Sequence, residues 1–109
     1  SIYLVSYFKS NSIKDNLCIS TARISNLHFG FKGNYSFTVE FKDVNGNLIS
    51  NKTRLCFGRD TAIVGKYFLV AYNKKMPNEY EILIRESDYN EYGLQYPDSM
   101  KWVENYLNR

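Results

Sequence analysis

Polar and apolar residues alternate most clearly between positions 35 and 42. Such alternation is typical of a strand with one buried face, and here the apolar positions are Tyr35, Phe37, Val39 and Phe41. The dipeptide Asn45-Gly46 follows, and it favours a tight type I′ hairpin turn, which needs positive φ at both central residues. We therefore predict a hairpin whose return strand covers residues 48–57.

Three further strands are predicted from residue pattern. Residues 17–27 alternate imperfectly, which indicates a bulge or a strand that contacts two layers. Residues 67–72 and 80–84 are rich in β-branched and aromatic side chains. A polar connection separates these two runs, so they predict a closing hairpin; it carries Lys74, Lys75, Pro77 and Asn78.

The tail changes to a helical pattern. Pro97-Asp98-Ser99 is typical of a helix start, and the predicted helix covers residues 97–108. One stripe of this helix carries Ser99, Trp102, Val103 and Tyr106. We expect it to dock on the sheet, bury Trp102 and cover an open edge.

These elements predict a mainly β fold with a C-terminal α-helix packed on it. Five strands of this length favour a strongly bent antiparallel sheet or a small, partly open barrel of the OB or SH3 kind. We assign residues 17–109 to this domain and residues 1–16 to a separate N-terminal segment. The start of that segment is apolar, so it is interpreted either as the remnant of an anchoring or export region or as a short first element packed on the barrel.

The closing hairpin carries the one family resemblance. The residues from Gly65 to Tyr72, followed by Pro77 and by Ile82 to Ile84, resemble the V-G-K-x-F-x-V-x-Y…P…I-L segment of small bacterial β-domain proteins. Many of these proteins come from Bacteroidota and have no assigned function, and they are exported or membrane-anchored. The resemblance implies a location in the cell envelope or periplasm, with any membrane contact made by a segment upstream of this chain. It brings no catalytic residues.

Composition and charge narrow the picture further. A chain of 109 residues with 17% aromatic side chains fits one β domain. Its net charge of +3 is uneven, because residues 1–78 are basic and residues 79–109 are acidic. Either the acidic tail packs over the basic body, or a basic face awaits a polyanion.

No residue pattern predicts catalysis, a metal site or a cofactor. His28 is the single histidine, and no nucleophile, base or phosphate-binding loop accompanies it, so we predict a protein that is not an enzyme. Cys18 and Cys56 either form a disulfide, which an exported protein permits, or remain two unpaired strand cysteines.

Candidate protein contacts come from polar segments. Tyr89, Tyr92 and Tyr96 lie in a predicted loop, where they either pack on the barrel or, if exposed, form an interface. Arg59, near a strand end, and Glu79, beside Tyr80, complete the predicted protein-binding residues.

The preferred function is a non-catalytic protein-interaction domain of a bacterial envelope protein. The alternative is a cytoplasmic immunity protein whose acidic tail, Glu79 to Glu104, binds and inhibits a basic secreted toxin. Third is a small barrel that binds oligonucleotides, which the low net charge disfavours. The sequence predicts no oligomeric state.

Overall fold

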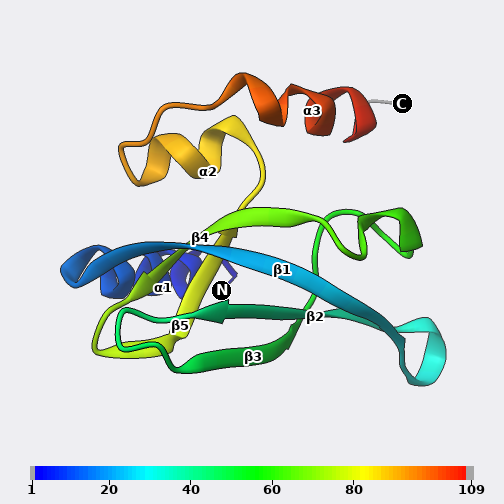
Figure 1. Cartoon of the computed structure of the whole chain (residues 1–109), viewed down its shortest axis with the longest axis horizontal. Helices are drawn as coiled ribbons and strands as arrows, with labels where there is room; N and C mark the ends of the chain where they lie inside the picture. Colours follow the sequence, from blue (N-terminus) through cyan, green and yellow to red (C-terminus); the bar gives the residue numbers. More distant parts are fainter. Residues whose placement is uncertain (1, 108–109) are drawn as a thin grey trace.

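The structure is a computed structural model that describes residues 2–107, with side chains from residue 9 onward. This part of the chain forms a curled five-stranded antiparallel sheet with helices before and after it (Figure 1). The strands are β1 (Leu17–Phe29), β2 (Tyr35–Lys42), β3 (Leu48–Thr53), β4 (Tyr67–Asn73) and β5 (Met76–Leu83). The helices are α1 (Ile2–Asp15), α2 (Glu86–Glu91) and α3 (Lys101–Leu107), with 3₁₀ turns at Phe31–Gly33, Thr61–Ile63 and Asp98–Met100. The predicted fold class is confirmed.

The long strand β1 holds the sheet together. The strand order is β3-β2-β1-β4-β5, and β1 pairs with β4 through its first half and with β2 through its second half. Its register shifts between Ile24 and Asn26, which confirms the predicted bulge. Because a bulge bends a strand, one continuous β1 can serve both halves of a strongly curved sheet.

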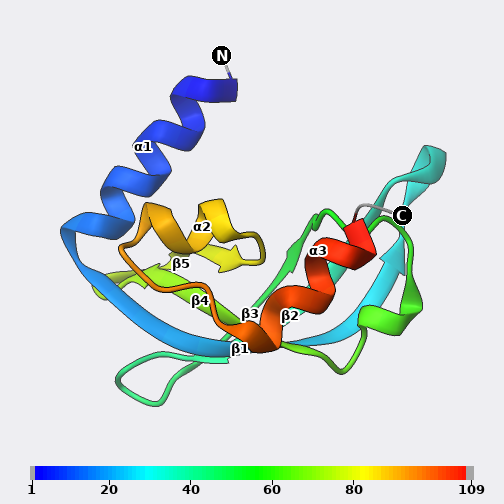
Figure 2. The same ribbon diagram turned by 90° about the horizontal axis from the view of Figure 1, so that it is seen from above.

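The core fills the interior of this curve. Phe37, Val39 and Phe41 of β2 are buried, as their alternation predicts. Strand β4 is buried on both faces, since Phe68, Val70 and Tyr72 alternate with Ala71 and Asn73 and all five are at most 4% exposed. Figures 1 and 2 show α2 and α3 together on one side of the sheet.

The two edge strands approach each other without pairing. The side-chain amide of Asn51 on β3 donates to Asn78 Oδ1 on β5 at 2.9 Å, and the hydroxyl groups of Thr53 and Tyr80 share a hydrogen bond. The backbone ladder contains no β3–β5 pair. The result is a partly open barrel whose seam, the gap between β3 and β5, is bridged by side chains.

The N-terminal segment is a helix that packs on the barrel. Ile13 is fully buried in the core, and the side-chain amide of Asn73 donates to the Ser12 carbonyl at 2.9 Å. The end of α1 is therefore packed on the barrel.

Three local predictions are corrected. In the β2–β3 turn only Gly46 has positive φ (82°), because Asp43 closes a longer loop by accepting from the backbone N–H groups of Asn45 and Asn47.

Strand β3 ends at Thr53, four residues before the predicted end. The β4–β5 turn is shorter than predicted, because Asn73 Oδ1 accepts from the N–H of Lys75 and of Met76. Pro77 and Asn78 then belong to β5, where the register shifts and a proline is tolerated.

Candidate protein-interaction surface

The tip of the β1–β2 hairpin exposes two phenylalanines. Phe29 ends β1 and is 65% exposed, and Phe31 begins the following 3₁₀ turn and is 82% exposed. The hairpin extends beyond the rest of the sheet in both views (Figures 1 and 2). Its two aromatic rings are therefore available to another molecule.

A long-range contact fixes this tip. The Arg59 guanidinium donates to the Gly33 carbonyl and lies 5.8 Å from the centre of the Phe29 ring. Gly33 has φ +79°, and a Cβ at this position would lie 2.6 Å from Arg59 Nη2. Glycine suits this left-handed backbone, and a side chain here would make the Arg59 guanidinium move.

The tip also contains backbone strain and positive charge. Lys32 has φ 58° and ψ 35°, a left-handed conformation that costs a non-glycine residue about 1–2 kcal/mol. Its ammonium group lies 5.8 Å from the centre of the Phe31 ring. We call Phe29, Phe31, Lys32 and Arg59 the hairpin-tip surface. Strain of this kind is found often at functional sites.

Trp102 is not buried as predicted. It is 36% exposed, and it stacks on Phe57 with ring centres 6.5 Å apart and planes 12° apart. The Lys66 ammonium lies 5.4 Å from the Trp102 ring. Val103, on the same predicted stripe, is fully buried, and Met100 in the turn before α3 is buried as well.

The predicted tyrosine contacts lie largely in the interior. Tyr89 and Tyr92 are buried and Tyr96 is half-buried, so burial removes Tyr89 and Tyr92 from the candidate interface. The rings of Tyr89 and Tyr96 meet edge to face at 5.2 Å. Residues 86–91 form α2 rather than part of a polar loop, and Tyr92 and Tyr96 follow this helix in a turn and a loop.

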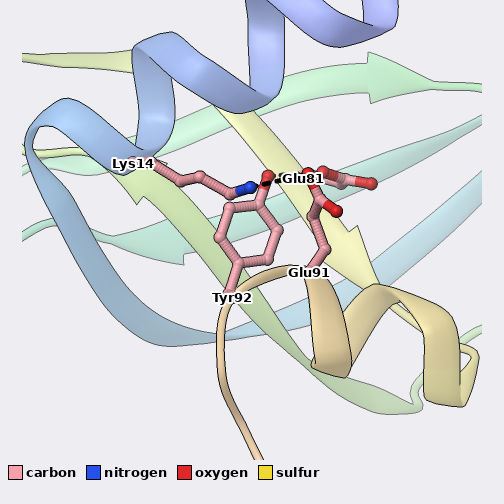
Figure 3. A network of polar contacts seen from close by, with 4 residues as sticks. All are labelled: Lys14, Glu81, Glu91 and Tyr92. Atoms are coloured by element: carbon pink, nitrogen blue, oxygen red, sulfur yellow. Dashed lines mark hydrogen bonds and ion pairs between the residues drawn. The ribbon is translucent and has the colours of Figure 1, made fainter.

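Tyr92 belongs to a polar network that joins α1, β5 and α2 (Figure 3). Its hydroxyl donates to Glu81 Oε2 at 2.5 Å, and the Lys14 ammonium pairs with Glu91 at 2.8 Å. Burial raises the pKa of Tyr92 strongly, and the hydrogen bond and negative charge of Glu81 raise it further. The Lys14–Glu91 ion pair supports the interpretation in which the acidic tail packs over the basic body.

Arg59 and Glu79 have different surroundings. Arg59 belongs to the hairpin-tip surface, whereas Glu79 accepts a hydrogen bond from the Ser12 hydroxyl of α1. The structure therefore brings Arg59 together with Phe29 and Phe31 at the hairpin tip, two residues that were not predicted as protein contacts. The sequence does show a signal for them, because Phe29 and Phe31 flank Gly30 in a predicted turn, where large apolar side chains are hard to bury.

Both cysteines are free thiols, so the predicted alternative of a disulfide is not what the structure shows. Cys18 lies on β1 opposite Tyr72 of β4, and Cys56 lies in the turn after β3. The first half of β1 pairs with β4 instead of β3, which explains why the two thiols do not meet. Burial raises the pKa of the Cys56 thiol, and Arg85 partly offsets this shift.

The remaining candidates contribute no further chemistry. His28 Nε2 lies 2.5 Å from the Thr38 hydroxyl on the neighbouring strand. Within the described residues, no three or more His, Cys, Asp or Glu side chains are grouped so as to hold a metal ion. None of the helices between residues 2 and 107 is both long and apolar enough to cross a bilayer.

Fold and surface together define a small curled β domain flanked by helices, with an aromatic, basic hairpin at one end. Comparison of the chain with protein-family models, curated proteins and solved structures gave no match.

Proposed function

We propose that this chain is a non-catalytic protein-interaction domain of the bacterial cell envelope and binds its partner through the hairpin-tip surface. The observation that carries the proposal is the exposure of Phe29 and Phe31 on a projecting hairpin that Arg59 holds in place. Exposed aromatic side chains on a fixed backbone lose little entropy on binding, and their burial is favourable.

Charge indicates the chemistry of the partner. Lys32 and Arg59 flank the two rings, so the complementary surface is an apolar pocket with carboxylates at its rim. Arginine and aromatic residues are the usual energetic centres of such interfaces. The envelope location is supported by the resemblance of the closing hairpin to exported bacterial proteins.

A paired-variant affinity experiment tests this function. The tagged chain would capture partners from envelope fractions of the source cells, next to the double variant Phe29→Ser/Phe31→Ser and the control Val44→Ser. Val44 is also exposed but lies in the opposite, β2–β3 turn, so the control removes apolar area elsewhere. We expect wild type and control to retain one protein that the double variant loses.

The captured protein is then purified and titrated. Two truncated interface anchors at about 2 kcal/mol each imply an affinity loss of about 30-fold or more for the double variant. Circular dichroism should be unchanged, because both rings are exposed. Wild-type affinity in the double variant would contradict the proposal.

An immunity function is the second candidate, and one observation favours it. Glu86 and Glu104 are exposed, make no ion pair within the described residues, and line a shared cavity next to α2. They would provide the acidic surface for a basic toxin. In that case Glu86→Lys/Glu104→Lys, and not the phenylalanine variant, would lose protection of cells that express a toxin gene from the same locus.

Oligonucleotide binding is tested on the same hairpin. Exposed aromatics beside cations, such as Phe31 with Lys32, can stack on bases. Labelled single strands are titrated at two salt concentrations. Salt-sensitive binding that the phenylalanine variant loses would assign the tip to nucleic acid instead of protein.

A further inference from the structure

A second candidate site lies at the open seam of the barrel, away from the hairpin tip. Between the end of β3 and the middle of β5 the structure contains a half-open cavity of about 330 Å³. Thr53 and Tyr80, whose hydroxyl groups bridge the seam, form part of its wall. Helix α1 contributes Lys9, and the α2 end contributes Arg85, Ser87 and Asp88.

Three cations from three different parts of the chain surround this cavity. They are Lys9 of α1, Arg54 just after β3, and Arg85 just before α2. Within the described residues none of the three forms an ion pair. The wall of the cavity also contains two carboxylates, Glu81 and Asp88, but neither forms an ion pair with these cations.

Two of the cations are held over aromatic rings. The Arg54 guanidinium lies 4.7 Å from the centre of the Tyr35 ring, and the Lys9 ammonium lies 5.6 Å from the centre of the Tyr80 ring. Cation–π contacts restrict long side chains without using their N–H donors. The donors remain available to a ligand.

The two carboxylates in the wall are already engaged. Asp88 Oδ2 accepts from the backbone N–H groups of Ile84 and Arg85, each at 3.0 Å. Glu81 Oε2 accepts from the Tyr92 hydroxyl at 2.5 Å. Asp88 thus caps the start of α2, and Glu81 holds the residue after α2 against β5. With three cations and two carboxylates, the lining keeps an excess of one positive charge.

We propose that the seam cavity binds the phosphate group of a small molecule through Lys9, Arg54 and Arg85. A tetrahedral phosphate dianion presents oxygens in several directions and can meet cations that come from three elements, whereas a planar carboxylate suits a single guanidinium. Thr53 and Ser87 supply neutral hydroxyl donors in the same wall. The volume is at the lower end of known ligand sites, about 300–1,000 Å³, which favours a small ligand.

Calorimetric titration of the whole chain tests the ligand class. The probes are inorganic phosphate, glycerol 3-phosphate as a monoester, and succinate, all at constant ionic strength in chloride. We expect saturable binding of a phosphate probe and none of succinate. Tighter binding of glycerol 3-phosphate than of phosphate would identify an organic phosphate as the ligand, and the reverse order would identify the free ion.

Charge-removing variants test the assignment of residues. Arg54→Gln and Arg85→Gln should each weaken phosphate binding by about tenfold or more, because each removes a charge-assisted hydrogen bond. Lys52→Gln is the matched control, since Lys52 is exposed on β3 and does not line the cavity. An equal loss of phosphate affinity in Lys52→Gln would show that only the net charge of the chain matters, and this would overturn the proposal.

The wild-type chain provides an independent measurement that needs no variant. Cys56 lines the cavity and Cys18 lies on β1, so each thiol can be followed by mass spectrometry during alkylation with neutral iodoacetamide. Bound phosphate should slow the reaction of Cys56 severalfold and leave that of Cys18 unchanged. The proposed site would be contradicted if saturating phosphate left the alkylation rate of Cys56 unchanged. It would also be contradicted if succinate slowed that reaction as much as phosphate does.

Discussion

Aromatic residues stabilise this domain in two different ways. Phe37 and Phe41 lie in the core inside the curve of the sheet. The centre of the Phe41 ring lies 5.2 Å from that of Tyr72 and 5.5 Å from that of Tyr80. Trp102 instead completes a cluster at the surface, where it stacks on Phe57. Burial of area dominates in the first case, and ring stacking adds a smaller amount in the second.

We expect the variant Trp102→Ala to lower the free energy of unfolding by about 1–2 kcal/mol, because the ring is partly solvated. Phe37→Ala should cost about 3–5 kcal/mol, since its ring is fully buried. Urea unfolding followed by circular dichroism measures both. Equal losses would show that Trp102 is part of the core after all.

Residue patterns predicted strands better than the short helix. In β2 the residues Phe37, Val39 and Phe41 alternate with polar ones, so only one face of the strand could be buried. In the short helix α3 the predicted stripe was correct for Val103, which is fully buried, but wrong for Trp102, which is 36% exposed. Periodicity chooses a face of the helix, but it does not tell which residue lies at the edge of that face.

Helix α2 is positioned by polar contacts as well as by apolar packing. Tyr92 and Glu81 form its hydrogen bond to β5, and Lys14 and Glu91 form its ion pair with α1. The two contacts differ in burial. The side chains of the ion pair are 41% and 44% exposed, whereas Tyr92 is buried.

The variant Tyr92→Phe should therefore lower the free energy of unfolding by about 1–2 kcal/mol, because it removes a donor to a carboxylate in a partly buried site. Lys14→Gln, the matched control in the same network, should cost less than about 1 kcal/mol because its ion pair is solvated. Urea unfolding at neutral pH compares them. The role of the hydroxyl would be refuted by a Tyr92→Phe effect no larger than that of Lys14→Gln.

Strands and turns could be predicted where the local residue pattern decides them, but the residues at which the strands end could not. The hairpins around Asn45-Gly46 and Lys74-Lys75 were expected from local residues. Asn73 was missed, although it is buried and bonds both the β4–β5 turn and Ser12 of α1. Its role depends on a helix 61 positions earlier in the chain, which no local pattern contains.

At the scale of the whole molecule, buried tyrosines should make the stability of the domain fall at alkaline pH. Burial raises the pKa above 10.0 for a set of hydroxyl groups, namely Tyr72, Tyr80, Tyr89, Tyr92 and Tyr96. Below this value the folded and unfolded chains both keep these protons. Above it the unfolded chain releases protons that the folded chain retains, so stability falls as pH rises.

We expect the free energy of unfolding attributable to these groups to be constant up to about pH 9 and to decrease from about pH 10 upward. Urea unfolding at a series of pH values measures this dependence. Tyr92→Phe should show a shallower decrease, since it removes the group with the largest shift. A slope identical to that of wild type would contradict the raised pKa of Tyr92.

The curled sheet followed from the number and pattern of strands, but the candidate sites did not. The seam cavity combines Lys9, Arg54 and Arg85, which are far apart in the chain and come together only when the sheet closes. The hairpin tip depends likewise on Arg59 reaching Gly33, 26 positions away. Tertiary contacts of this range carry no signature in one sequence.

The packing of α1 has a consequence for synthesis on the ribosome. Ser12 and Lys14 emerge early, yet their partners Glu79 and Glu91 follow 67 and 77 positions later. A nascent chain therefore holds its first helix without a docking surface until most of the translation of this domain is complete. Until β4, β5 and α2 have been synthesised, Ile13 has no core to enter, so this stretch waits longest for its contacts and is exposed to chaperones that bind apolar segments.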